Sequence, residues 1–396
     1  MTHDKRILTI NSGSSSLKVA LFCMGDSETR QLSGSIERIG LPDGCFRIRD
    51  DDDKILVEKH ANFATHAAAL TAFLHWLQKR EDSFDAVGHR IVHGGQYCTE
   101  PRRITPKFER ALAKLKHLDP DHLPHELKAI KSVRRSYPNL QQVACFDTAF
   151  HCDKPQVAQV YPLPRKLWHD GVRRYGFHGL SYEFIVSEMA RVTDAQNNDS
   201  RTVIAHLGNG ASMAAIRGGK SIDTTMGFTP VGGLMMSTRS GDLDPGVMLY
   251  LLREKRVSPS RLSDLVNRRA GLWGFSGISS DMGDLLALEK RNSQAAETVA
   301  LFCYQTKKFL GAMTSVLGGL DTLIFTAGIG ENAPAIRWRI CENLDFLGIR
   351  LDSTRNKRNA PIISCDGSPV TIRVMKTNEE VMIARHTRAV IQKNEK

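Results

Sequence analysis

Residues 7–22 read ILTINSGSSSLKVALF, two apolar runs joined by a polar turn of serine and glycine. Apolar, β-branched runs on either side of such a turn predict two strands connected by a tight loop. The pattern returns at residues 202–219, where TVIAHL leads into GNGAS and MAAIRGG follows. Two hairpins of this kind, far apart in the chain, indicate a duplicated architecture in which each half offers one tight backbone loop.

The rest of the chain alternates between strand and helix patterns. Short apolar runs bounded by Gly, Asp or Thr predict strands at residues 84–94, 141–147, 321–328 and 370–377. Apolar spacing and N-cap residues predict helices at residues 61–80, 244–255, 293–317 and 378–393. Alternation of this kind is typical of an α/β protein.

The domain organisation follows from length and from the last helix. At 396 residues the chain is long enough for two or three domains. The C-terminal helix is long enough to pack back against the first domain. We therefore expect one discontinuous domain of residues 1–149 with 381–396, and a second domain of residues 150–380.

Composition excludes several classes of protein. With 41% hydrophobic and 24% charged residues the chain is not expected to be disordered. It has no run of about 18 apolar residues, so no membrane association is expected. The start, MTHDKRILTINSG, has no apolar stretch long enough for a secretory signal, which favours a cytoplasmic location. None of the eight cysteines forms a C-x-x-C pair, so they are interpreted as reduced thiols.

The net charge of +11 is distributed rather than concentrated. No tract of five or more Lys or Arg occurs, and the Arg-Arg pairs are scattered along the chain. Nucleic-acid binding proteins gather positive charge on one face or segment, so nucleic acid is not the expected partner. The surplus suits an enzyme of small anionic substrates.

Three glycine-rich turns follow predicted strands, in NSGSSSLK (11–18), HLGNGAS (206–212) and TAGIGEN (326–332). Backbone N–H groups in such turns, helped by hydroxyls, can bind phosphate oxygens, and Lys18 can add charge. None is a Walker A loop, and neither of the last two completes G-x-G-x-x-G. Each alone could be a plain turn; together they would suit the parts of a nucleoside triphosphate.

Charged side chains occur beside glycine or at strand ends. Arg90 in GHRIVHGG and Arg239 in STRSGDLDP could bind phosphate or carboxylate, or form surface salt bridges. Asp147 follows an apolar strand, where a carboxylate can hold Mg²⁺ or cap a helix. His178 and His122 could be catalytic or structural.

Taken together, these stretches closely resemble the acetate kinase family, within the superfamily of acetate and sugar kinases, heat-shock ATPases and actin. The shared motifs, in order along nearly the whole chain, are NSGSSSLK, VGHRIVHGG, FDTAFH, YGFHGLSY, HLGNGAS, DTTMGFTP, MMSTRSGDLDPG, TAGIGEN and TNEE. The resemblance implies two duplicated actin-like ATPase (ribonuclease H-like) α/β domains with a cleft between them, and a homodimer. It also implies reversible phosphoryl transfer between ATP and acetate, giving acetyl phosphate and ADP, with Mg²⁺ or Mn²⁺.

The resemblance also implies roles for single residues. Arg90 and Arg239 would grip the substrate carboxylate and the transferring phosphoryl group. His178 would stabilise that group, and His122 would assist from the other side. Asn11 would line the phosphate and metal end with the serines that follow it, Ser12, Ser14, Ser15 and Ser16. Asp147 and Glu379 would support the metal directly or through water, although Glu380 could take the place of Glu379 or either could serve only as a cap.

Binding residues are implied in the same way. The methyl group of the substrate would be enclosed by Val92, Phe177 and Pro230. The nucleotide would be held by Lys18, His206, Leu207, Gly208, Asn209, Gly210, Asp281, Gly328, Ile329, Gly330, Glu331 and Asn332. The intact GIGEN favours ATP over pyrophosphate as the donor.

One stretch departs from the family. Where the family usually has A-P-L-H-N-P, this chain has DPDHLP at residues 119–124, which puts Asp121 in the place of a leucine beside the substrate methyl and Leu123 in the place of an asparagine. An unpaired carboxylate in a dry anion pocket would be costly. Either Asp121 points away, or the acceptor is not plain acetate. Ser237 is a smaller departure, since the family usually has glycine there.

Two alternatives stay open. The scaffold could serve propionate or another short-chain acid, which is a question of chain length rather than of reaction class. Less in keeping with the sequence is an actin-like module that binds a nucleotide without an acceptor, because such a module has no need of Arg90, Arg239, His122 and His178.

Overall fold

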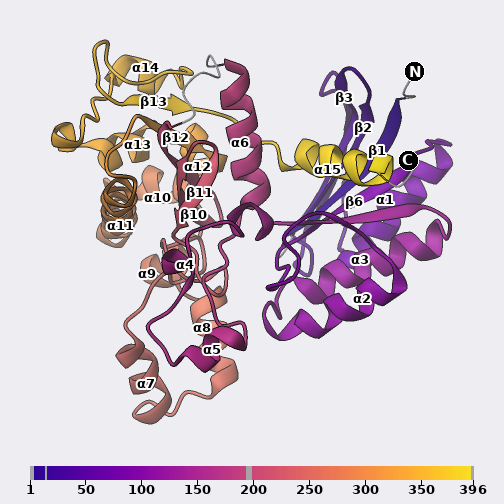
Figure 1. Ribbon diagram of the computed structural model, residues 1–396, viewed down its shortest axis with the longest axis horizontal. Helices are drawn as coiled ribbons and strands as arrows, with labels where there is room; N and C mark the ends of the chain where they lie inside the picture. The colour runs from indigo at the N-terminus through magenta and orange to yellow at the C-terminus, as the bar shows by residue number, and fades with distance from the viewer. Residues whose placement is uncertain (1–3, 14–15, 193–198, 394–396) are drawn as a thin grey trace. The chain divides into compact units, whose positions relative to one another are not determined.

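The computed structural model describes residues 4–13, 16–192 and 199–393. Within these ranges no helix is long and apolar enough to cross a membrane. The chain packs into two compact units, coloured by residue number in Figure 1. The first comprises Met1–Phe150, Gly179–Phe184 and Asn378–Lys396, and the second comprises His151–His178 and Ile185–Thr377. The domains expected at 1–149 with 381–396 and at 150–380 stay a prediction about which parts fold independently.

The first unit is built on an eight-stranded mixed sheet in the order β5-β4-β3-β2-β1-β6-β8-β7. Strand β1 pairs antiparallel with β2 and parallel with β6, and β6 pairs parallel with β8. The strands are β1 (Lys5–Ser12), β2 (Leu17–Met24), β3 (Glu28–Glu37), β4 (Cys45–Asp50), β5 (Ile55–His60), β6 (Ala86–Ile91), β7 (Arg102–Arg103) and β8 (Gln141–Phe146). The hairpin predicted from residues 7–22 is therefore confirmed as β1 and β2.

Helices cover both faces of this sheet, as Figure 1 shows. One face carries α1 (His66–Lys79), α2 (Pro106–Ala113) and α3 (Leu123–Ser136), and the other carries α15 (Glu379–Lys393). Successive residues of β1 serve the two cores, since Leu8 packs under α1 and Ile7 packs under α15. Gly88 lets α15 approach β6, because a Cβ there would lie 2.3 Å from Oγ1 of Thr387.

The second unit repeats the same succession of strands. Its five-stranded sheet has the order β11-β10-β9-β12-β13, with β10 antiparallel to β9 and with β9, β12 and β13 mutually parallel along the sheet. The strands are β9 (Arg201–Leu207), β10 (Ala211–Arg217), β11 (Lys220–Thr224), β12 (Thr322–Thr326) and β13 (Thr371–Val374). This order matches β3-β2-β1-β6-β8, so the predicted duplicated α/β architecture is confirmed.

Most other helices belong to the second unit, and α6 begins in the first unit and continues in the second. They are α4 (Gln156–Gln159), α5 (Arg165–His169), α6 (Gly179–Val192), α7 (Pro245–Arg253), α8 (Pro259–Arg268), α9 (Gly271–Ser276), α10 (Met282–Leu288), α11 (Ser293–Leu317), α12 (Ala327–Asn332), α13 (Pro334–Cys341) and α14 (Ser353–Lys357). Short 3-10 helices occupy Lys114–His117, Ala149–His151 and Asp345–Leu347.

Two local predictions need correction. The motif TAGIGEN was expected to be a glycine turn, but residues Ala327–Asn332 form the short helix α12 directly after β12. The helix predicted over residues 61–80 begins at His66, because the hydroxyl of Thr65 accepts from the backbone N–H of Ala68 and caps the helix there.

Candidate active site

In the first unit, the candidate residues gather at the carboxyl ends of three neighbouring parallel strands. Asn11 lies near the end of β1, Arg90 near the end of β6, and Asp147 directly after β8. Parallel strands present their carboxyl ends at one edge of the sheet, which is where α/β proteins commonly bind ligands. Glu379, the first residue of α15, reaches the same place from the other end of the chain.

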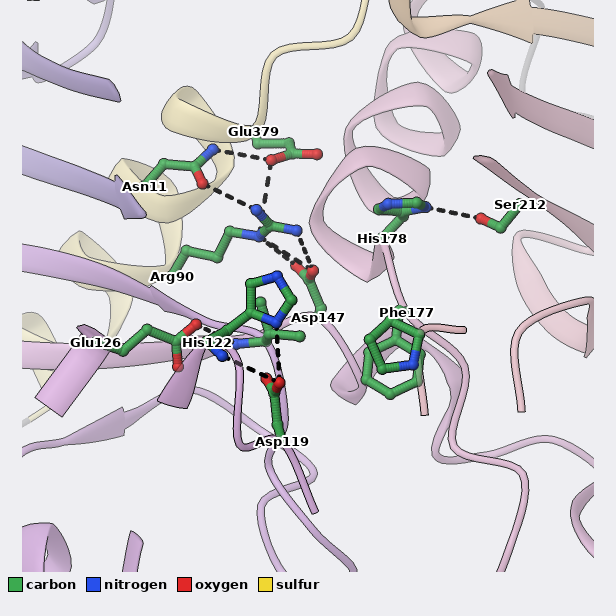
Figure 2. Close-up of polar contacts among 12 residues, drawn as sticks. Asn11, Arg90, Asp119, His122, Glu126, Asp147, Phe177, His178, Ser212 and Glu379 are labelled. Atoms are coloured by element: carbon green, nitrogen blue, oxygen red, sulfur yellow. Dashed lines mark hydrogen bonds and ion pairs between the residues drawn. The ribbon is translucent and has the colours of Figure 1, made fainter. Parts of the chain in front are cut away.

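Arg90 is the centre of this group (Figure 2). Its Nε donates to Oδ1 and Oδ2 of Asp147 at 3.1 and 3.0 Å, and its Nη1 donates to Oδ1 of Asn11 at 3.0 Å. Nδ2 of Asn11 donates in turn to Oε2 of Glu379 at 2.9 Å, which lies 3.8 Å from Nε of Arg90. The guanidinium is thus fixed in orientation by acceptors from three different elements.

The charge of Arg90 is strongly stabilised. Burial alone would lower the pKa of this guanidinium, but the charges of Asp147 and Glu379 raise it above its ordinary value. The side chain of Asp147 is 1% exposed and that of Arg90 is 14% exposed. Arg90 is therefore a permanent, oriented positive charge with little freedom to move.

Lys18, Ser14 and Ser15 were also predicted to bind phosphate in the loop after Asn11. Lys18 lies on β2 directly opposite Asn11 in the antiparallel register, and its side chain is exposed. Ser14 and Ser15 lie outside the described residues. The strand pairing therefore brings Lys18 into register with Asn11 at this strand end.

His122 lies at the N-terminus of α3, in contact with a residue to which sequence reasoning gave no role. Its Nδ1 is 2.9 Å from Oδ1 of Asp119, and the same oxygen accepts from the backbone N–H of His122 at 3.2 Å. Burial raises the pKa of Asp119, but the hydrogen bonds and charge of His122 outweigh this effect and hold the pKa below its usual value. Asp119 is therefore an ionised carboxylate although it is only 2% exposed.

Val92 is buried just beyond the end of β6, and its backbone N–H donates to Oε1 of Glu126 at 3.0 Å. Burial and the nearby charge of Asp119 raise the pKa of Glu126 well above its ordinary value. Oε2 of Glu126 has no hydrogen-bond partner among the described residues. Glu126 is therefore a second acid next to the candidate site that the sequence alone did not single out.

In the second unit, His178 lies in a strained but well-held position. Its φ is 59°, a left-handed conformation that is uncommon for a residue with a side chain. Its Nδ1 lies 2.8 Å from Oγ of Ser212, and its ring stacks on His206 with centroids 4.1 Å apart (Figure 2 shows the contact with Ser212). Non-glycine residues in this region often mark functional sites.

Arg239 and His178 approach the same glycine. A Cβ built on Gly210 would lie 2.9 Å from Nε2 of His178 and 3.8 Å from Nη1 of Arg239. Nη1 of Arg239 also donates to the carbonyl oxygen of Pro230 at 3.1 Å. The second unit therefore brings together the predicted residues His178, Arg239, Pro230 and Gly210.

The segment that carries Phe177 and His178 is held by two buried side chains. His151 contacts the carbonyl oxygen of Phe177 through Nε2 at 3.0 Å. Lys154 donates to the carbonyl oxygens of Arg174 and Tyr175 at 3.2 and 2.9 Å, and burial lowers its pKa to about 8. Phe177 itself is 1% exposed.

The two predicted nucleotide loops lie next to each other because β9 and β12 are neighbours. His206 and Leu207 end β9, and a Cβ on Gly208 would lie 3.4 Å from Cβ of Ala327 and 3.9 Å from the backbone N of Gly328. Asn209 is fixed by Ser237, whose backbone N–H donates to its carbonyl oxygen at 3.1 Å and whose hydroxyl donates to Oδ1 at 3.2 Å.

The GIGEN segment is held by its own residue Glu331 and by Arg337 of the next helix, α13. Oε1 of Glu331 accepts from the backbone N–H groups of Ala327 and Thr377 at 2.8 and 3.2 Å. Arg337 is fully buried and donates to the carbonyl oxygens of Gly330 and Glu331 at 2.8 and 2.9 Å. Ile329 and Asn332 belong to the same short helix, α12.

Asp281 is the predicted nucleotide residue that the described contacts leave apart from these loops. It caps α10, where Oδ1 accepts from the backbone N–H groups of Gly283 and Asp284 at 2.7 and 3.2 Å. A capping role explains its position, and its assignment to the nucleotide stays a prediction.

Comparison with known proteins agrees with this geometry. A family model described as the acetokinase family matches residues 6–385. An acetate kinase of Coprothermobacter proteolyticus is 43% identical, covering 98% of this chain and 99% of the relative, and one of Rhodopseudomonas palustris is 43% identical over 96% and 97%.

Solved structures give the same answer. The crystal structure of Porphyromonas gingivalis acetate kinase superimposes with a TM-score of 0.87 at 36% identity, covering 98% of this chain and all of that one. A propionate kinase from Francisella tularensis superimposes with a TM-score of 0.90 at 33% identity, with the same coverage. The chain therefore belongs to the acetokinase family and is a phosphotransferase.

Proposed function

We propose that this protein is an acetate kinase, which transfers a phosphoryl group reversibly between ATP and acetate to give acetyl phosphate and ADP. The observation that carries the proposal is the fixed guanidinium of Arg90, held by Asp147 and Asn11 at the carboxyl edge of the first sheet. Family membership over residues 6–385 supports the reaction class.

The chemistry needs little from the protein except positioning and charge. An acetate oxygen is already a nucleophile, so no strong base has to act on it. The transferring phosphoryl group carries charge on three equatorial oxygens, while the attacking and leaving oxygens lie in line with phosphorus. Fixed cationic donors stabilise this arrangement more than the ground state, and that difference lowers the barrier.

The residues of each unit suit a part of this task. In the first unit, Arg90 would bind an oxygen of the acid or of the transferring group, and Val92 would contact the methyl group. In the second unit, Arg239 and His178 would donate to phosphoryl oxygens, with Phe177 and Pro230 beside the acyl group. The contacts of Arg239 and His178 with Gly210 support a shared task for these two side chains.

The adjacent loops of the second unit would hold the nucleotide. Asn209 and Gly210 would offer backbone N–H groups beside the start of α12, and Gly328, where a Cβ would meet no atom within 4 Å, leaves room for close approach. Glu331 is engaged in holding this loop, so we propose that it acts by shaping the loop rather than by touching the nucleotide. ATP rather than pyrophosphate is the proposed donor.

We propose that a divalent cation binds at the end of β1. The carboxylate of Glu379 and the amide oxygen of Asn11 are ligands of the kind that Mg²⁺ or Mn²⁺ prefers, and Asp147, whose oxygens accept from Arg90, would support the ion through water. No group of three or more His, Cys, Asp or Glu suited to a metal occurs among the residues that the structure describes. When bound, such an ion neutralises charge on the phosphate oxygens. Asn11 and Glu379, which contact each other at 2.9 Å, would hold it on the protein side.

We further propose that the protein acts as a homodimer through α7. This helix has the apolar sequence PGVMLYLLR, yet none of its residues is buried. Val247, Leu249 and Tyr250 are 44–49% exposed, and Trp273 and Phe275 of α9 in the same unit are also exposed. Large apolar side chains gathered on a surface are typical of protein interfaces. Size-exclusion chromatography with light scattering should report twice the chain mass.

Propionate is the alternative acceptor, because the chain also resembles a propionate kinase from Francisella tularensis at 33% identity. A hydroxamate assay with ATP, Mg²⁺ and straight-chain acids of two to four carbons tests both proposals. We expect kcat/KM to be highest for acetate. A maximum at three or four carbons would replace acetate by a longer acid, and nucleotide consumption independent of any acid would overturn the kinase proposal.

A further inference from the structure

The loop before α3 is organised around one buried carboxylate. Oδ1 of Asp119 lies 2.9 Å from Nδ1 of His122 and also accepts the backbone N–H of that residue. The carbonyl oxygen of Asp119 accepts the backbone N–H of Leu123 at 3.3 Å. One residue therefore fixes both the backbone turn and the ring of His122.

This contact determines which ring nitrogen carries a proton. A carboxylate can only accept, so Nδ1 of His122 must carry the proton that joins it to Asp119. Nε2 is then the ring nitrogen on the side away from Asp119, and in Figure 2 it points toward Arg90 and Asp147.

The second carboxylate oxygen of Asp119 is the unusual part of this contact. Asp119 is 2% exposed, and its Oδ2 has no hydrogen-bond partner among the described residues. Keeping a buried carboxylate with one oxygen unpaired is costly, and such a cost is typical of functional rather than structural groups.

We propose that Asp119 is a positioning residue for His122: its carboxylate holds the ring through Nδ1–H and fixes Nε2 toward the Arg90–Asp147 pair. This rests on the proposed function in so far as His122 acts on the anionic substrate there. Asp119 itself does not touch the substrate. It acts through the orientation and proton placement of His122, as carboxylates do for the histidines of other enzymes.

The proton placement can be observed directly. In protein labelled with ¹⁵N-histidine, the resonances of His122 are assigned by their loss in His122→Gln. We expect the wild type at pH 7.5 to show a protonated Nδ1 for His122. In Asp119→Ala we expect this signal to change to a mixture of tautomers. A wild-type His122 with an unprotonated Nδ1, or an unchanged signal in Asp119→Ala, would overturn the proposal.

A matched control exists in the same unit. Glu183 and His386 form another carboxylate–histidine pair, with Oε2 and Nε2 2.8 Å apart. Glu183→Gln should change the signal of His386 and leave that of His122 unaltered. Loss of the His122 signal in this control would show that it reports general loosening of the unit, and the assignment to Asp119 would be withdrawn.

Kinetics then separate positioning from binding. We expect Asp119→Ala to lower kcat about 10- to 100-fold while KM for ATP stays within about 3-fold, since a misplaced group costs rate more than nucleotide affinity. Asp119→Asn keeps the shape and one acceptor oxygen and should lose less. Equal kcat in the wild type, Asp119→Ala and Asp119→Asn would overturn the proposal that Asp119 supports the reaction through His122. If the wild type phosphorylates no acid, the proposed function fails, but the ¹⁵N measurement still decides whether Asp119 orients His122.

Discussion

The guanidinium of Arg90 contacts both carboxylate oxygens of Asp147, and the two side chains are among the most enclosed charges of the first unit. Their strands, β6 and β8, are parallel neighbours, so the pair closes the edge of the sheet where both strands end. A guanidinium held in this way loses little conformational entropy on binding an anion, because its orientation is already set. Pre-organisation is therefore the property of Arg90 that the proposed reaction uses.

Arg90→Ala and Arg239→Ala should each lower turnover by at least about 100-fold, because each removes an oriented positive charge from the transferring group. Steady-state rates in the hydroxamate assay measure this effect. Arg47→Ala is the control, since the side chain of Arg47 is 34% exposed and pairs with Glu58 outside the candidate site, and it should keep full turnover. Turnover within about 3-fold of wild type in both test variants would remove these arginines from the active site.

Asp147→Asn should destabilise the protein by about 3 kcal/mol, because a buried ion pair that loses one partner leaves a charge without compensation. Glu58→Gln removes a carboxylate from an arginine pair whose side chains are 34% and 38% exposed. That variant should show no measurable loss, because solvent screens an exposed pair. Urea unfolding followed by circular dichroism measures both. Equal stability losses would mean that the Arg90–Asp147 pair is solvated like a surface pair.

The strand pattern was enough to predict the local positions of Asn11, Arg90 and Asp147, each at or just after a strand. Their proximity follows from the parallel pairing of β1, β6 and β8, which the strand pattern did not predict. The pairing of β9 with β12 brings their loops together in the same way.

Side-chain networks could not be predicted in this way. Asp119 and His122 are three residues apart in a loop, and the pattern gives no sign of whether their side chains meet or diverge. Glu126 faces Val92 only because α3 packs beside β6, which is a matter of tertiary structure. The helix α12 was missed because glycine residues favour turns locally, whereas Glu331 within the segment and Arg337 of α13 hold it through side-chain contacts.

Gly210→Ala should lower turnover at least about 10-fold without unfolding the protein. The added Cβ would lie 2.9 Å from Nε2 of His178, so the ring has to move, and small displacements of a catalytic group are costly in rate. Gly311→Ala is the control, because a Cβ there meets no atom within 4 Å and alanine favours the helix. Thermal melting should show no loss for the control. Full activity of Gly210→Ala would show that His178 does not depend on this contact.

Glu126→Gln should stabilise the protein increasingly as the pH rises. Burial raises the pKa of Glu126 well above its ordinary value, so the folded state holds the proton more tightly than the unfolded state. Its contribution to stability is complete below the ordinary pKa of a glutamate and is lost as the pH rises through the folded value. Glutamine keeps the oxygen that accepts from Val92 and never ionises.

The difference in Tm between Glu126→Gln and wild type should therefore be small at pH 5 and larger at pH 8. The variant Glu100→Gln, at an exposed glutamate, should show no such trend. A difference that shrinks with rising pH would mean that Glu126 is ionised and stabilising in the folded protein.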